Sequence, residues 1–295
     1  MINRINRKFW AKKRVFITGH TGFKGSWLSI FLNYLGAEVT GYSLKPLTKP
    51  SLYKLANVDK VIKKSIIADV RDYKRLFKEI KNSNATILFH LAAQPLVRYS
   101  YLLPKETFDI NVVGSLNILE CVRKINKIKS TIIITTDKVY DNSKNKIFQE
   151  TDRLGGIDPY SSSKVCVEHL FSSYHDSFFK RSSKQRLATV RAGNVIGGGD
   201  RGKNRLIPDF FKTKKEMYIR SPYSIRPWQF VLDPLYGYLK LSKYIHNKKL
   251  QSSQLSLNFA PNDKKAKNVK YIINKINQNF NKKIIFKKNN KIKEK

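Results

Sequence analysis

Residues 14–25 read RVFITGHTGFKG, and this stretch decides the fold. Its first five residues, 14–18, form a short apolar run that is typical of a buried strand. Residues 25–35 follow with apolar side chains at i, i+3, i+4 and i+7, the spacing of one helix face, and Gly36 stands where that helix would end. The stretch therefore predicts a strand, a glycine-rich turn and a helix, in that order.

The same alternation of strand and helix continues through the first two thirds of the chain. Further strands are expected at 38–42, within 61–68, and at 85–91, 131–134 and 187–191. Further helices are expected at 73–81, at 106–124 and from about residue 160. Regular alternation of this kind predicts an α/β fold, a Rossmann-like doubly wound parallel sheet.

From about residue 195 this rhythm breaks, because glycine, proline and aromatic residues become frequent. We expect a smaller C-terminal substrate lobe here, folded over the carboxyl edge of the sheet, where open α/β sheets bind ligands. The expected division is a Rossmann-like domain at 12–194, a substrate-binding lobe at 195–275 and a lysine-rich tail at 276–295. The last dozen residues are expected to fray.

The composition limits the class of protein. A length of 295 residues with 41% hydrophobic content suffices for one large core and a smaller lobe. The sequence contains no apolar run long enough for a transmembrane helix, and no secretory-type segment follows the basic N-terminus. Cys121 and Cys166 are interpreted as reduced core thiols. A cytoplasmic protein with no membrane partner is therefore expected.

The formal net charge of +37 has two interpretations. A charge of this size is typical of proteins that bind nucleic acid. However, the excess is mostly lysine, spread along the chain among Asn and Ile, whereas arginine is better suited to bidentate recognition of bases and phosphates. Because the codons for Lys, Asn and Ile are A/T-rich, genome composition explains the charge, and we expect no nucleic-acid partner. Separately, we expect no metal site.

The glycine turn has the form G-x-x-G-x-x-G between a strand and a helix. Its glycines let the backbone approach a pyrophosphate, and the helix start offers free N–H groups with a partial positive charge. A dinucleotide site is therefore predicted. The residues assigned to it are Gly19, Thr21, Gly22, Phe23, Lys24, Gly25, Asp69, Val70, Leu91, Ala92 and Ala93, together with Tyr160 and Lys164.

Two positions of this site leave alternatives open. Residues 41–45, at the end of the second strand, lack the acid that often binds the adenosine ribose, and Lys45 would suit a 2′-phosphate. NADP therefore remains an alternative to NAD. Asp69 fits a contact to the adenine edge, but it would equally serve as the acid at the N-terminus of the next helix.

The strand at 131–134 is followed by Thr136, Asp137 and Lys138, and further along Tyr160 and Lys164 lie four residues apart on one helix face. An ammonium group favours the phenolate, so the phenol is expected to ionise more easily. A phenolate takes a proton from an alcohol while hydride leaves the same carbon. These groups predict oxidation of an alcohol, with an additional acid and base.

The acid and base roles expected for Asp137 and Lys138 conflict with the pKa values that two adjacent charged residues should have. Asp137 would need a raised pKa to donate a proton, yet the adjacent Lys138 ammonium lowers it. Lys138 would need desolvation to act as a base, and in a regular strand the two side chains would point to opposite faces. The backbone is therefore expected to leave strand geometry at Asp137. The alternative is a surface ion pair at the end of a strand.

Several longer strings extend the pattern. They are GHTGFKGSWL at 19–28, HLAAQPLVR at 90–98, RAGNVIGGGD at 191–200, RLIPD at 205–209 and RPWQ at 226–229. With Asn111 and the Tyr160/Lys164 pair, they resemble the extended short-chain dehydrogenase/reductase family. In this order they are similar to its CDP-glucose 4,6-dehydratases, over about residues 12–260.

This resemblance implies an NAD-dependent lyase that acts on CDP-glucose without net oxidation or reduction. It implies that Tyr160, Lys164 and Thr136 act in oxidation of the sugar C4 hydroxyl, and that Asp137 and Lys138 eliminate water across C5 and C6. It also implies a set of residues that contact the substrate. These are Gln94, Arg98, Asn194, Leu206, Ile207, Pro208 and Arg226.

Two departures from the family pattern stand out. Phe230 replaces a usual histidine, and after about residue 261 a short lysine-rich stretch replaces further lobe structure, so an incomplete substrate lobe is expected. A homodimer through the helices at 106–124 and 160–179, and a role in lipopolysaccharide O-antigen biosynthesis, are also implied. The alternatives are another nucleotide-sugar dehydratase or epimerase of the same fold, or a non-catalytic relative that acts as a scaffold.

Overall fold

The computed structural model describes residues 7–141, 147–180, 184–247, 255–261 and 267–287. Its centre is a sheet in the order β11-β6-β5-β4-β1-β2-β3, in which every neighbouring pair is parallel. The strands are β1 (Arg14–Thr18), β2 (Glu38–Ser43), β3 (Lys64–Ile67), β4 (Ile87–His90), β5 (Ser130–Ile134), β6 (Arg186–Ala192) and β11 (Leu255–Phe259). The strand order reverses between β1 and β4, so the sheet is the predicted doubly wound, Rossmann-like one.

The segments between the strands are helical. They are α1 (Arg7–Trp10), α2 (Phe23–Tyr34), α3 (Leu52–Leu55), α4 (Val58–Val61), α5 (Tyr73–Ser83), α6 (Val97–Leu102), α9 (Pro159–Tyr174), η4 (His175–Phe179) and α11 (Leu232–Asn247). The predicted helix at 106–124 is present as α7 (Pro104–Phe108), the π-helical turn η2 (Asp109–Val113) and α8 (Gly114–Lys124), with helical backbone at each junction. The helices predicted at 25–35, at 73–81 and from about 160 are confirmed as α2, α5 and α9.

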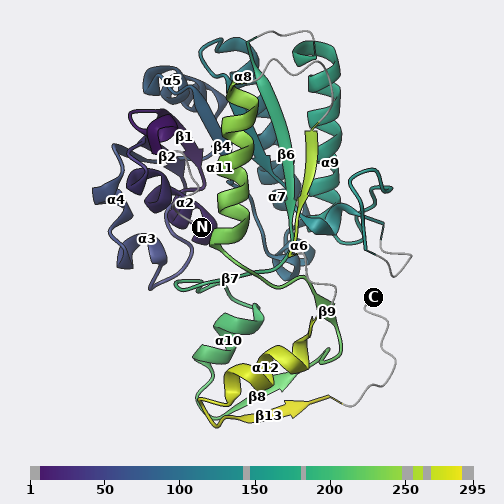
Figure 1. The fold of residues 1–295 in the computed structure, drawn as a ribbon. Coiled ribbons are helices and arrows are strands. Elements are labelled where there is room, and N and C mark those ends of the chain that lie inside the picture. Colours follow the sequence, from purple (N-terminus) through teal and green to yellow (C-terminus); the bar gives the residue numbers. More distant parts are fainter. Residues whose placement is uncertain (1–6, 142–146, 181–183, 248–254, 262–266, 288–295) are drawn as a thin grey trace.

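Helices cover both faces of the sheet. On one face α2 and α11 pack on inward side chains such as Val15 and Ile17. On the other face α5, α8 and α9 pack on Phe16 and its neighbours. Figure 1 shows α11 crossing in front of the strands. Burial of both faces explains why these strands read as continuous apolar runs in the sequence rather than as alternating ones.

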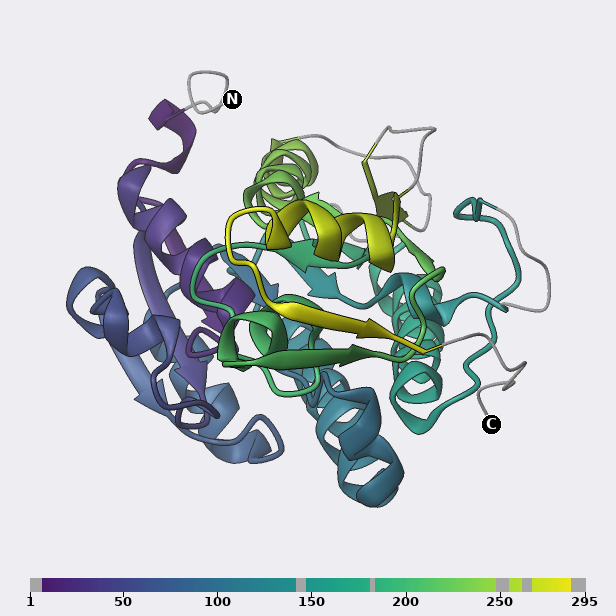
Figure 2. The same ribbon diagram turned by 90° about the horizontal axis from the view of Figure 1, so that it is seen from below.

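The smaller lobe lies beyond the carboxyl ends of the strands, below the sheet in Figure 1 and in front of it in Figure 2. Its apolar cluster is formed by Phe210, Met217, Ile219, Val269 and Ile273. The main elements of the lobe are α10 (Leu206–Lys212), β8 (Glu216–Ile219), α12 (Val269–Asn277) and β13 (Lys283–Phe286), with β8 and β13 parallel. Short pairs are made by β7 (Val195–Ile196) with β10 (Gln229–Phe230), and by β9 (Ile225–Arg226) with β12 (Lys267–Asn268).

The lobe differs from its expected limits of 195–275. Helix α11 and strand β11 return to the main domain, because the apolar face of α11 is buried on the sheet and β11 pairs with β6. The expected start of a tail at residue 276 falls inside α12, and the lobe continues to Phe286. The reason is that Ile284 and Phe286 pack on the lobe cluster, an apolar alternation that the surrounding lysines conceal in the sequence. Residues 288–295 lie outside the described residues.

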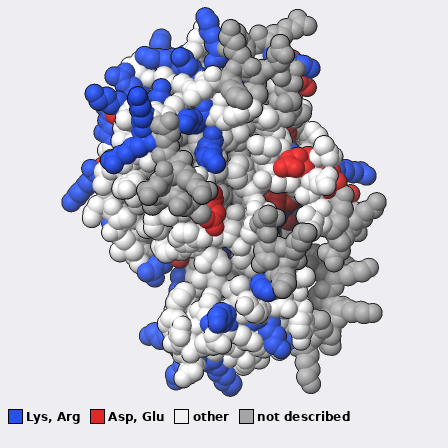
Figure 3. Space-filling view, in the orientation of Figure 1, with Lys and Arg blue, Asp and Glu red and all other residues white. Residues whose placement is uncertain are grey.

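Two surface properties bear on partners. Lys and Arg side chains cover parts of both the main domain and the lobe on the face drawn in Figure 3, so the positive charge on this face is not confined to one patch. Among the described residues, no helix combines the length and the apolar character needed to cross a membrane.

Candidate active site

The glycine turn joins β1 to α2 at the point where the strand order reverses. Gly19 has a positive φ of 79°, and a Cβ there would lie 2.7 Å from the backbone nitrogen of Ala92. A Cβ at Gly25 would lie only 2.0 Å from the carbonyl oxygen of Gly19, so this close backbone contact requires glycine. Among the described residues, no side chain caps the start of α2 at Gly22. The N–H groups of its first turn are therefore available to a pyrophosphate. The loop therefore fits a dinucleotide.

The predicted adenosine end is built from β2 and the segment after β3. The hydroxyl of Thr21 donates to the carbonyl oxygen of Leu44 and lies 2.9 Å from Ser43 Oγ, which holds the glycine loop against the end of β2. Asp69 forms an ion pair of 2.6 Å with Arg71. The alternative role for Asp69 as the N-terminal acid of the next helix is not observed, because Asp72 caps α5.

The segment after β4 approaches the glycine loop. Leu91 N and Ala92 N donate to the backbone and side-chain oxygens of Thr18, at 3.1 and 3.2 Å. Gln94, predicted to contact substrate, has its amide hydrogen-bonded within the protein: Nε2 donates to Thr107 Oγ1 and to Leu96 O, and Oε1 accepts from Leu96 N. The Gln94 side chain therefore holds this loop in shape, a role that its sequence position does not reveal.

The backbone leaves strand geometry where the sequence required it to. Strand β5 ends at Ile134, and the short 3-10 turn η3 (Asp137–Val139) follows. The hydroxyl of Thr136 accepts a hydrogen bond from Lys138 N at 3.3 Å and donates to Asp137 Oδ1 at 3.2 Å. Because the turn replaces a strand, Asp137 and Lys138 are not forced to opposite faces. Asp137 is half-buried, whereas Lys138 is exposed.

The electrostatic conflict at Asp137 is resolved in favour of an acid. Burial raises the pKa of Asp137, and this effect exceeds the lowering by the hydrogen bond from Thr136 and by the charges of Lys138 and Lys24. A Cβ at Gly193 would lie 2.8 Å from Asp137 Oδ2 and 2.4 Å from Pro227 Cγ. An Asp137 carboxyl oxygen therefore lies close to Gly193, just after the end of β6.

Helix α9 brings the phenol and the amine to the same place. Its N-terminus is fixed by a capping box between Asp158 and Ser161, and Tyr160 N donates to Ser100 Oγ at 3.1 Å. The amine of Lys164 donates to the carbonyl oxygen of Ile134, the last residue of β5, at 3.1 Å. The predicted convergence of the Tyr160/Lys164 pair with the end of β5 is therefore present.

The pKa shift of Tyr160 in the structure is opposite to the one expected from the sequence. Burial raises the pKa of Tyr160 to about 12, although a hydrogen bond from Thr136 opposes the rise. Burial lowers the pKa of Lys164 to about 8, opposed by the charge of Glu168 and assisted by that of Lys24. The expected easy ionisation of the phenol is thus not seen, because desolvation of the phenolate and the charge of Asp137 exceed the lowering of the pKa by Thr136 and Arg205.

Lys24 lies close to Asp137, a proximity that its place in the glycine motif does not predict. It lies in the first turn of α2, and burial lowers the pKa of its amine to about 8, with further lowering by Arg205 and an opposing effect of Asp137. Its charge also acts on Lys164. The amine therefore lies near Asp137 of η3 as well as in the glycine turn.

The predicted substrate residues surround the junction of sheet and lobe. Asn194 follows β6 and is exposed, as is Arg226 in β9, whose charge reaches Asp137. Arg98 is exposed and donates from Nη1 to Asn204 Oδ1 at 3.1 Å. Leu206, Ile207 and Pro208 form the first turn of α10, and Leu206 also packs on the lobe cluster. Arg205, in an ion pair of 3.1 Å with Asp200, is a further cation here that was not predicted.

Comparison with known proteins gives a consistent set of relatives. A family model described as GDP-mannose 4,6 dehydratase matches residues 16–294. A CDP-glucose 4,6-dehydratase of Salmonella typhimurium is 46% identical over 280 residues, which cover 92% of this chain and 77% of that protein. A dTDP-D-glucose 4,6-dehydratase of Dictyostelium discoideum is 29% identical over 67% of this chain and 47% of its own length.

Solved structures share the fold at lower identity. The dTDP-glucose 4,6-dehydratase of Bacillus anthracis, solved in complex with NAD, has a TM-score of 0.74 at 21% identity, covering 93% of this chain and 84% of that one. The NDP-hexosamine 5,6-dehydratase TunA has a TM-score of 0.75 at 22% identity, covering 94% and 84%. The UDP-glucose 4-epimerase of Thermotoga maritima, with a TM-score of 0.77 at 19% identity and coverage of 94% and 86%, shows that the fold is shared beyond dehydratases.

The glycine turn generates a prediction about dinucleotide binding. In Gly25→Ala the added methyl group would collide with the carbonyl oxygen of Gly19, so NAD affinity measured by calorimetry should fall at least about tenfold. The matched control is Gly198→Ala, since a Cβ at Gly198 would have no heavy atom within 4 Å. Equal affinities of both variants and the wild type would contradict the assignment of the loop.

Proposed function

The chain belongs to the GDP-mannose 4,6 dehydratase family, and from this membership we propose that it is an NAD-dependent lyase that converts CDP-glucose to CDP-4-dehydro-6-deoxyglucose. The proposal of CDP-glucose rests on one observation above others, the 46% identity to a CDP-glucose 4,6-dehydratase over 92% of the chain. The meeting of Thr136, Asp137, Tyr160 and Lys164 at the carboxyl edge of the sheet supports the same reaction.

NAD is the proposed cofactor, with its pyrophosphate at the first turn of α2. Gly19, Gly22 and Gly25 would allow the close approach, and Phe23 and Lys24 would offer backbone N–H groups. Leu91, Ala92 and Ala93, after β4, would border the nicotinamide half, and Val70 and Asp69 the adenine. When bound, NAD supplies a hydride acceptor that later returns the hydride, so the reaction has no net redox change.

For the first step we assign the proton transfer to Tyr160. Its phenolate would remove the proton of the sugar C4 hydroxyl, and Thr136 would hydrogen-bond the same oxygen. Because burial raises the pKa of Tyr160 to about 12, the phenolate needs additional positive charge. Lys164 would supply it, since its buried amine on the same helix face retains a pKa of about 8.

For the second step we assign elimination of water to η3, which we call the catalytic turn. The C4 ketone makes the proton on C5 acidic, and an amine would remove it while the bond from C6 to its hydroxyl oxygen breaks. Asp137, whose pKa burial raises, would protonate the leaving hydroxyl to give water. Lys138 is the amine that the resemblance assigns as base, and Lys24 is a second buried amine near Asp137. The hydride taken from C4 is then added to C6, and a proton is returned to C5.

The substrate would lie across the junction between the sheet and the lobe. Arg226 and Asn194 would bind its diphosphate, because a guanidinium group matches phosphate oxygens in a bidentate manner. Arg98 would face the sugar, and Leu206, Ile207 and Pro208 would border the nucleotide. Gln94 would act indirectly, by shaping the loop after β4.

We also propose a cytoplasmic homodimer that makes sugar precursors for lipopolysaccharide O-antigen. The stretch from α6 to η2 exposes Leu102, Leu103 and Val113, and η4, after α9, exposes Phe178. Exposed apolar side chains on these helical segments suit pairing with a second copy. Sedimentation should then give a mass of about twice 34.2 kDa, and a monomer at micromolar concentration would contradict the dimer.

The substrate assignment is tested with purified protein, NAD and CDP-glucose. We expect the alkaline absorbance of a 4-keto sugar to appear, and to be much weaker with dTDP-glucose, UDP-glucose or GDP-mannose. Tyr160→Phe is the negative control. A preference for another nucleotide would overturn the CDP-glucose assignment, and no product from any of the four sugars would indicate a non-catalytic relative.

The division of roles between the two steps gives a second prediction. Asp137→Asn removes the acid but leaves the Tyr160/Lys164 pair, so NADH formation should persist while water loss slows by about 100-fold. Rapid-mixing absorbance of NADH and product analysis measure the two steps separately. Tyr160→Phe serves as the comparison, because it should abolish both. If Asp137→Asn slowed both steps equally, Asp137 would have no specific part in elimination.

A further inference from the structure

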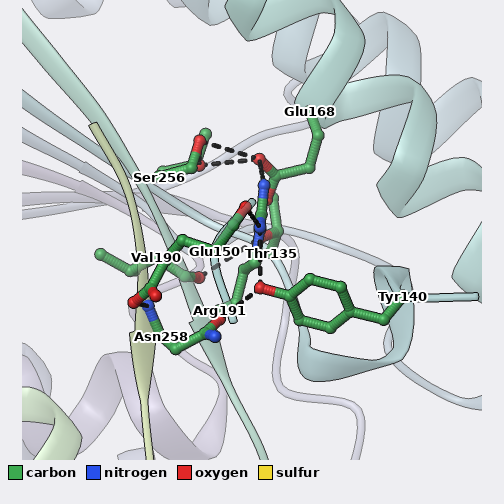
Figure 4. Close-up of polar contacts among 9 residues, drawn as sticks. Thr135, Tyr140, Glu150, Glu168, Val190, Arg191, Ser256 and Asn258 are labelled. Atoms are coloured by element: carbon green, nitrogen blue, oxygen red, sulfur yellow. Dashed lines mark hydrogen bonds and ion pairs between the residues drawn. The ribbon is translucent and has the colours of Figure 1, made fainter. Parts of the chain in front are cut away.

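A buried carboxylate lies behind the catalytic groups and takes no part in the steps above. Glu168, 2% exposed, stands on α9 four residues after Lys164 and eight after Tyr160, on the same helix face. Its carboxylate is held by Arg191 of β6, which donates from Nε to Oε1 at 3.0 Å and from Nη2 to Oε2 at 2.9 Å. Figure 4 shows this bidentate ion pair at the centre of a polar cluster.

The same carboxylate joins three strands to α9. Thr135, which follows β5, donates its hydroxyl to Oε1. Thr189 of β6 donates to Oε2 at 2.8 Å, and Ser256 of β11 lies 3.3 Å from the same oxygen. Glu168 therefore ties α9 to β6, to β11 and to the residue that follows β5 (Figure 4).

The ion pair also fixes both ends of the catalytic turn. Thr135, immediately before Thr136, is bonded to Glu168. Tyr140, immediately after η3, accepts from Arg191 Nη1 at 2.8 Å and donates to Asn258 at 2.7 Å. The turn that carries Asp137 is thus held at its start by one member of the pair and at its end by the other.

The charge of Glu168 acts on the catalytic amine. Burial lowers the pKa of Lys164, and the negative charge of Glu168 opposes this lowering. The other titratable groups facing Lys164 are Lys24 from α2, which assists the lowering, and His90 from β4, which burial keeps neutral with a pKa of about 3. Tyr160 shares its helix face. Glu168 is therefore the anionic group that favours the charged form of Lys164.

We propose that Glu168 is a positioning residue that, with its ion-pair partner Arg191, holds the catalytic turn against α9 and places a negative charge one helical turn from Lys164. Its effect is indirect, through Lys164 and Thr135. The kinetic consequence rests on the proposed function, because it assumes that a charged Lys164 supports the Tyr160 phenolate. The effect on the ionisation of Lys164 itself does not require any substrate.

The test compares Glu168→Gln with the wild type in two measurements. NMR of protein carrying 15N-labelled lysine, with the Lys164 signal assigned by comparison with Lys164→Met, reports the ionisation of the buried Lys164 amine from pH 6 to 10. Without the negative charge the ammonium is less favoured, so the midpoint should fall by about 1 pH unit from the wild-type value. The alkaline limb of kcat with CDP-glucose should move to lower pH by the same amount.

The matched control is Thr189→Val, which removes one hydrogen bond to the carboxylate but leaves its charge, so its midpoint should equal that of the wild type. Because Glu168→Gln leaves Arg191 buried without its partner, Glu168→Gln with Arg191→Met is made in parallel; it also removes a cation, so its midpoint should fall by less than that of Glu168→Gln. An unchanged Lys164 midpoint in Glu168→Gln, or in the double variant if only that one folds, would overturn the proposal. A shifted midpoint in a protein whose wild type makes no product would refute the proposed function only.

Discussion

Parallel pairing of β1, β4, β5 and β6 brings the ends of four strands to one edge, and the candidate site depends on that alignment. The glycine turn follows β1, the Leu91 segment follows β4, the Asp137 turn follows β5 and Asn194 follows β6. None of these segments carries a complete chemical function alone. The lobe that begins after β6 lies over the same edge, so a molecule bound there would meet all four strand ends.

Desolvation at this edge sets the ionisation of the reactive groups. Burial is the largest influence on Asp137, Tyr160 and Lys164, raising the pKa of the first two and lowering that of the third. These shifts favour the protonated forms of the Asp137 carboxyl and the Tyr160 phenol, and they make the protonated form of the Lys164 amine less favourable. The charge of Glu168 opposes the lowering of the Lys164 pKa, and the ion pair of Glu168 with Arg191 fixes the turn between Thr135 and Tyr140.

Much of this arrangement can be predicted from the sequence, because it depends on local patterns. The apolar runs and helical spacings predict where the strands end. From these ends follow the positions of the glycine turn, of Thr136 and Asp137, and of the Tyr160/Lys164 pair. The remainder depends on contacts between distant segments. The use of Gln94 inside a loop, the approach of Lys24 to Asp137, and the pairing of Glu168 with Arg191 all require the folded chain. Packing of Phe286 on the lobe is likewise hidden among lysines.

The most direct test of the account follows one hydrogen atom through the reaction. CDP-glucose deuterated at C4 would be converted by the protein with NAD, and the product examined by NMR. The account predicts deuterium in the C6 methyl group, because the hydride taken from C4 is returned to C6 after water is lost. Deuterium retained at C4, or lost to solvent while product forms, would contradict it.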